Sequence, residues 1–168
     1  METQVFINAL SQALGQQVEK DGEGAYAFLL DGVPVLLHYR PWDSSFLLHM
    51  EIGYPTGLGG RIHARLLGAN FLLSETHGAA ISLDERTGLA FLELALGLNG
   101  LDGAGFVGRV ESFVALADEW TRRLQEWNDE IESQAGSRVE TFLRELESGA
   151  PDDQTDEAKA AVMPMIRV

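Results

Sequence analysis

The sequence predicts an α+β fold in which a twisted antiparallel sheet packs against helices. Apolar residues recur every three or four positions near both ends and the middle of the chain, which is the spacing of amphipathic helices. Between these segments, shorter apolar runs with period-two alternation are bounded by Gly, Pro and Asp, as strands are. Because 45% of the 168 residues are apolar and 23% are charged, the chain can bury one globular core.

The first elements are a helix and a β-hairpin. The spacing of the apolar residues in 5–18 predicts one helix over the first twenty residues. The following run, AYAFLLDGVPVLLHY, is split by Asp31-Gly32, a strong signal for a two-residue hairpin turn. If these two residues form the turn, Phe28 faces Val35 on the core side of the sheet.

The reverse side of this hairpin is also mostly apolar, whereas a solvated antiparallel face usually alternates to polar residues. Its residues are Ala25, Ala27, Leu29, Pro34, Leu36 and His38. We therefore expect a partner to cover this face.

The remaining pattern is strand, helix, two strands and a long helix. SSFLLHMEI predicts a third strand with Leu47, His49 and Glu51 on its reverse side. A helix is expected over residues 58–73, and AAISLD and GLAFLELAL predict the fourth and fifth strands around the turn DERTG. An apolar heptad seam from Phe106 to Ile131 predicts the long helix, and we assign this seam to the core.

Three segments follow from this pattern. Residues 1–130 form the expected α/β domain. A capping-box pattern at Ser137 and Glu140 predicts an additional helix over residues 131–149. Residues 150–168 are expected to be a flexible acidic tail with an apolar end.

The charge and composition exclude several classes of partner. The formal net charge is −14, so phosphate backbones and anionic membrane surfaces repel the chain, and we expect no nucleic-acid partner. A basic protein segment is attracted instead. No apolar run approaches the roughly 20 residues that span a bilayer, so no membrane insertion is expected. The chain has no cysteine and no signal-like start, which favours a cytoplasmic protein.

Motifs for catalysis or metal binding are weak. Gly57, Gly59 and Gly60 precede a helix but lack the rest of a phosphate-binding fingerprint. A metal cluster would have to come from scattered side chains, His38, His49, Glu51 and His63, without a standard ligand spacing. Ser74, Glu75 and His77 are only neighbours in sequence, which does not predict a triad. We expect no enzyme, no cofactor and no metal.

Residues 61–120 carry a resemblance to a known family. RIHARLLGANFLLSETHGAAISLDERTGLAFLELALGLNGLDGAGFVGRVESFVALADEW resembles the class I type III secretion chaperones of Gram-negative bacteria, and with the order of elements the resemblance extends over about residues 1–130. The matching positions are Leu66, Leu67, Ala69, Asn70, Gly78, Ala79, Ile81, Leu83, Asp84, Gly88, Leu98, Leu101, Asp102, Phe113, Ala117 and Trp120.

The resemblance implies a function. Such a protein is a cytoplasmic homodimer that binds the N-terminal segment of a secreted effector in extended form and keeps it export-competent. It then delivers the effector to the secretion apparatus, whose ATPase is a further candidate partner. The alternative from charge alone is an acidic inhibitor or immunity-type protein that blocks a basic partner.

Two sets of residues follow from these expectations. The expected client-binding residues are Phe6, Leu10, Leu29, Pro34, Leu36, His38, Leu47 and His49. The expected dimer-interface residues are Ile62, Leu66, Leu67, Phe71 and Phe91.

Overall fold

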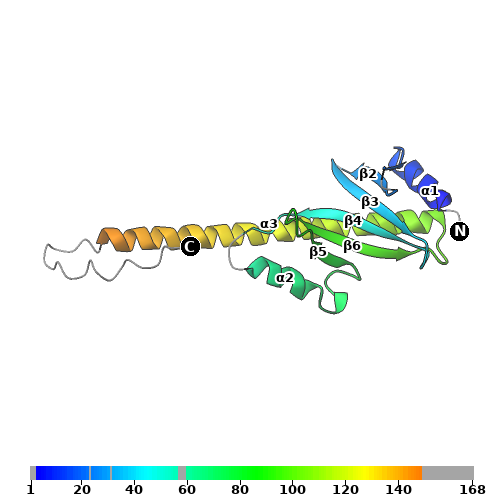
Figure 1. Ribbon diagram of the computed structural model, residues 1–168. Helices are drawn as coiled ribbons and strands as arrows, with labels where there is room; N and C mark the ends of the chain where they lie inside the picture. The colour runs from blue at the N-terminus through cyan, green and yellow to red at the C-terminus, as the bar shows by residue number, and fades with distance from the viewer. Residues whose placement is uncertain (1–2, 23, 31, 57–59, 149–168) are drawn as a thin grey trace. The chain divides into compact units, whose positions relative to one another are not determined.

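The computed structural model describes residues 3–22, 24–30, 32–56 and 60–148 (Figure 1). The chain divides into two units, residues 1–132 and residues 133–168. The elements in chain order are α1 Gln4–Leu14, β1 Glu19–Lys20, β2 Tyr26–Leu30, β3 Val33–Arg40, β4 Ser45–Gly53, α2 Arg61–Ala69, the 3-10 helix η1 Phe71–Leu73, β5 Ala80–Leu83, β6 Ala90–Gly97 and α3 Gly103–Ser148.

The strands form one antiparallel sheet in the order β1-β2-β3-β4-β6-β5. In the β2–β3 hairpin, Leu30 pairs with Val33 and Phe28 with Val35, so the register predicted from the turn is confirmed. Asp31 itself lies outside the described residues. The predicted α+β class and the predicted order of the larger elements are also confirmed.

One face of the sheet carries the core, and all three helices contribute to it. Figure 1 shows the first part of α3 running along the sheet. Its heptad seam is buried from Phe106 to Leu124, which confirms that this stripe belongs to the core. The ring of Phe106 lies 5.2 Å from that of Phe6 and 5.5 Å from that of Phe46, so α1, α3 and β4 meet at this point.

The first helix is shorter than predicted. It ends at Leu14 because Gly15 adopts a left-handed conformation, with φ of 63°, and donates its backbone N–H to the carbonyl of Gln12. Glycine reaches this conformation without the steric cost that a Cβ brings. The chain then forms the short edge strand β1, which the sequence pattern did not reveal.

The long helix begins earlier and ends later than predicted. Asp102 accepts the N–H of Gly105 at 2.7 Å and so caps its first turn. Ser137 does not start a separate helix, because it lies inside α3 and its carbonyl accepts the hydroxyl of Thr141 at 2.9 Å. The expected tail, residues 150–168, lies outside the described residues.

Trp120 and Trp42 offer a matched test of this core. Trp120 is fully buried, whereas Trp42 is 77% exposed on the β3–β4 turn. We expect Trp120→Ala to lower the free energy of unfolding by about 3–5 kcal/mol, since it leaves a large cavity. Trp42→Ala should change it by less than about 0.5 kcal/mol, as exposed positions do. Urea denaturation followed by circular dichroism measures both, and equal effects would contradict the described core.

Candidate functional site

The face of the sheet opposite the core, called the outer face here, contains the largest set of predicted site residues. Leu36 is paired with Ala27 on β2 and with His49 on β4, and Leu47 with His38 on β3 and Ala95 on β6. Leu29, Pro34 and His38 are exposed, while Leu36, Leu47 and His49 are half-buried. The structure therefore brings these six residues together on one continuous surface.

A polar group interrupts the apolar residues in the middle of the outer face. The Nδ1 atom of His49 lies 3.0 Å from Oε1 of Glu93 on the neighbouring strand. The imidazole also stacks on the ring of Phe91, with 4.3 Å between centroids and 21° between planes. These contacts fix the orientation of His49, whose neighbour Glu51 adds a second half-buried carboxylate to the face.

Phe6 and Leu10 are a correction to the expected client site. Their side chains are buried in the core, with Phe6 packed against Phe106. They face inward because α1 lies on the core side of the sheet and needs its apolar stripe to close the domain. They therefore support the fold and present no surface to a client in this structure.

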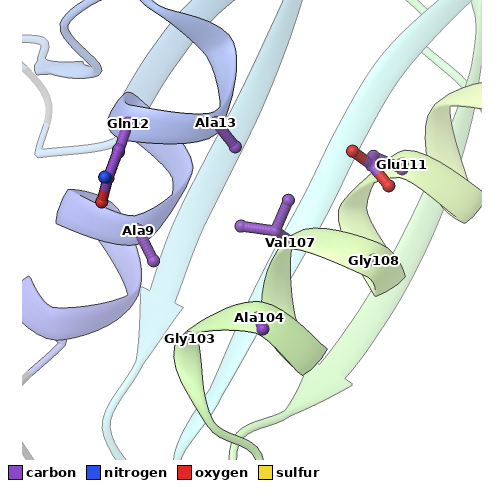
Figure 2. A pocket seen from close by; sticks show the side chains of 8 residues that line it. All are labelled: Ala9, Gln12, Ala13, Gly103, Ala104, Val107, Gly108 and Glu111. Carbon is purple, nitrogen blue, oxygen red and sulfur yellow. The ribbon is translucent and has the colours of Figure 1, made fainter.

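The accessible residues of α1 include Ala9, Gln12 and Ala13, which line a groove between α1 and α3 (Figure 2). It has a volume of about 420 Å³, and its lining residues are mostly small: Ala9, Gln12, Ala13, Gly103, Ala104, Val107, Gly108 and Glu111. The helices approach closely here, since a Cβ on Gly103 would lie 2.9 Å from that of Ala9. The sequence signal for this groove was the run of small residues in Gly103-Ala104-Gly105, whose role only the packing revealed.

The two edges of the sheet differ in how they are closed. At β5, the side chain of Asn70 accepts the N–H of Ile81 at 2.8 Å and donates to its carbonyl at 2.9 Å. Asn70 thus takes the place of a neighbouring strand, and the edge is protected from pairing with another chain. At the opposite edge, the exposed Gln16 donates a single hydrogen bond to the carbonyl of Leu29 at 2.7 Å.

The expected dimer residues separate into three groups. Ile62 and Leu66 are buried in the core, so they are corrected to structural residues, because α2 uses this stripe to pack within its own chain. Leu67 and Phe71 are 68% and 73% exposed. Phe91 belongs to the outer face, where it stacks on His49.

The exposed residues of α2 continue into η1. Leu72 and Leu73 have left-handed backbone conformations, with φ of 58° and 53°, and both side chains are exposed. A left-handed conformation costs roughly 1–2 kcal/mol for a residue with a Cβ. This segment therefore holds a strained backbone while it exposes leucine side chains, which is typical of a surface that meets a partner.

Other chemistry is sparse in the part of the chain that the structure describes. Within it, no cluster of three or more potential metal-ligating side chains occurs. Its helices also include none long and apolar enough to cross a membrane. Asp84 begins the β5–β6 turn, and the hydroxyl of Thr87 and the N–H of Arg86 hold its pKa below the ordinary value by donating hydrogen bonds to its carboxylate.

The comparisons with known proteins agree with this architecture. Residues 5–121 match the model of the Tir chaperone protein (CesT) family. The chain therefore belongs to this family of chaperones, as the resemblance in the sequence predicted. A search of curated proteins found no match.

Several solved structures share the fold. A chain from the ExsC–ExsE complex has a TM-score of 0.62 and 21% identity, and the match covers 73% of this chain and 92% of that one. A chain from the HopA1–SchA chaperone–effector complex has a TM-score of 0.57 and 21% identity, over 74% and 92% of the two chains. The type III secretion chaperone SycH of Yersinia pestis, solved with a fragment of YscM2, gives 0.52 and 20%, over 67% and 93%.

Asn70→Ala tests the closure of the β5 edge. The change leaves the N–H and carbonyl of Ile81 without their side-chain partner, and we expect it to lower the free energy of unfolding by about 1–3 kcal/mol. It should also increase concentration-dependent association, because the edge becomes free to pair. Gln16→Ala is the control at the other edge, where one exposed bond is lost. Chemical denaturation and light scattering report the two effects, and equal behaviour of the variants would argue against edge closure by Asn70.

Proposed function

We propose that this protein is a cytoplasmic chaperone of a Gram-negative bacterium that binds the N-terminal segment of a type III secreted effector. It keeps the segment in an extended, export-competent form and delivers it to the secretion apparatus. The proposal involves no catalytic step and no cofactor. The similar structures include the HopA1–SchA chaperone–effector complex and the type III secretion chaperone SycH, which supports this assignment.

The observation that carries the proposal is the apolar outer face. The domain already has a closed core on the other side of the sheet, so its own fold does not require apolar side chains at Leu29, Leu36 and Leu47. An ordinary antiparallel sheet with one solvated face has polar residues at such positions. A client segment that covers these residues would give them a function.

The magnitude of this effect is sufficient for specific binding. Complete burial of a leucine side chain is worth roughly 1.5–3 kcal/mol, so three leucines could contribute several kcal/mol before the entropy of ordering a flexible segment is subtracted. An extended client could add backbone hydrogen bonds at the β1–β2 edge, where only Gln16 covers the carbonyl of Leu29. Backbone pairing tolerates many sequences, and the apolar surface would then select the client.

We also propose a homodimer built on the exposed surface of α2 and η1. Leu67, Phe71 and Leu72 are three of the most exposed large apolar residues in the described part of the chain, and they lie within six residues of one another in sequence. A two-fold axis through this surface would double the number of client sites. The ATPase of the secretion apparatus is a candidate partner for delivery.

Leu36→Glu tests the client surface. It places a charge between Ala27 and His49 without touching the core, so we expect a folded protein whose client affinity falls at least about tenfold, from lost apolar burial and a buried charge. Trp42→Glu is the control, because it introduces the same charge at an exposed apolar residue on the β3–β4 turn, which belongs to none of the proposed contact surfaces. The measurement is recovery of an effector from native cytoplasm by each variant, quantified by mass spectrometry.

Salt adds a second criterion to this experiment. If apolar contacts hold the client, its affinity should change little as the salt concentration rises. An acidic inhibitor held by charge would instead lose affinity for its partner steeply. Full retention of client by Leu36→Glu would show that the outer face is not the client site.

Leu67→Glu tests the proposed dimer. The residue is 68% exposed, so the change should leave the domain folded but introduce two like charges across the two-fold contact. We expect the mass in sedimentation equilibrium to fall below that of the wild type, because the contact between the α2 and η1 surfaces is lost. Arg109→Glu, an exposed change on α3, serves as the control and should leave the mass unchanged. A Leu67→Glu protein with the wild-type mass would place the interface elsewhere.

A further inference from the structure

The end of α3 carries an apolar face that the shared fold does not explain. The family match stops at residue 121, and the similar structures cover only 67–74% of this chain while covering 92% or more of their own. Residues 133–148 form a helical segment in a unit of their own. They are therefore an addition to the common domain, and their surface needs a separate account.

Four large apolar residues share one side of this segment. Val139, Phe142, Leu143 and Leu146 stand at positions i, i+3, i+4 and i+7, which places them on one helix face, called the α3 stripe here. Each of them is 52–59% exposed. The segment continues α3 and contains Gly136, which weakens a helix, so packing of the stripe against a partner would stabilise this part of α3.

The charges of the segment indicate which partner fits. Residues 133–148 contain two arginines and three glutamates, a net charge of −1, whereas the whole chain carries −14. A basic client would therefore be attracted mainly to other parts of the molecule. A second copy of this segment, by contrast, meets little repulsion and offers the same apolar face.

We infer that the α3 stripe packs antiparallel against the α3 stripe of a second copy. The spacing is symmetric about its midpoint, so a two-fold axis there sets Val139 opposite Leu146 of the partner and Phe142 opposite Leu143.

This contact differs from the proposed dimer on α2 and η1, and it does not depend on client binding. It gives the added segment a role in self-assembly, either by linking dimers or by strengthening one dimer. Each case requires the same local pairing of the two segments. The experiment therefore reports on that pairing directly.

The absence of native cysteine makes disulfide trapping a clean test. We expect a mixture of full-length Val139→Cys and Leu146→Cys proteins to form a mixed disulfide dimer under mild oxidation. Each variant alone should cross-link at least about tenfold more slowly, because two copies of residue 139 would be about 10 Å apart along the helix axis, too far for a disulfide. Ser137→Cys, which falls on the opposite side of the helix, is the control for random collision.

Two further substitutions, each introduced into both cysteine variants, test whether the disulfide depends on the α3 stripe or on the α2–η1 dimer. Leu143→Glu added to both cysteine variants should abolish the mixed disulfide, while circular dichroism shows the domain still folded. The mixed disulfide should persist when Leu67→Glu is present in both chains, and its loss there would assign the proximity to the α2–η1 dimer and overturn the inference.

Three other outcomes would also overturn it. Rapid cross-linking of Val139→Cys with itself would indicate a parallel pair. Equal cross-linking of Ser137→Cys would indicate collision alone. No mixed disulfide, together with reduced client recovery by Leu143→Glu in the otherwise unchanged chain, would assign the α3 stripe to the client.

Discussion

The structure depends on one constraint: the sheet has apolar residues on both faces, but the helices of the domain form the core on only one of them. The core face is closed by α1, α2 and the seam of α3, which leaves Phe106, Trp120 and Leu37 fully buried. The outer face keeps Leu29 exposed and Leu36 half-buried. Since exposed apolar surface in water is unfavourable, the outer face is tolerated only while it stays small or is covered by another chain.

The polar features of the molecule limit the contacts that this apolar surface could make. Asn70 closes the β5 edge with two hydrogen bonds to Ile81, and so removes one site for unwanted strand pairing. The net charge of −14 opposes random association of apolar faces, because it keeps the molecules apart at long range. The His49–Glu93 pair places polar atoms at the centre of the outer face. Together these features are expected to limit aggregation through the exposed leucines.

Backbone strain marks a second surface. Leu72 and Leu73 adopt left-handed conformations in a short segment that exposes them, although glycine would be the less costly residue at both positions. Large side chains exposed at a conformational cost support the proposed contact of α2 and η1 with a second copy. The same reasoning applies to the α3 stripe, where four apolar side chains lie outside the fold shared with the relatives.

The sequence by itself determined the α+β class, the register of the β2–β3 hairpin and the burial of the α3 seam. Each of these follows from a local rule: a two-residue turn fixes which residues face each other, and a strict heptad of large apolar residues must be packed. The family was also recognisable, because its characteristic positions lie in the regular elements between residues 61 and 120.

Only the tertiary structure decided which apolar stripe closes the domain and which remains available to a partner. The helical periodicity of an apolar stripe is the same whether the stripe is buried or accessible. In this structure, α1 and α2 direct their stripes toward the core, which buries Phe6, Leu10, Ile62 and Leu66. The role of Asn70 was equally hidden, since it depends on the position of Ile81, eleven residues away in another element. Periodicity identifies an apolar face, but the neighbour of that face is set by packing over long sequence distances, which no local pattern encodes.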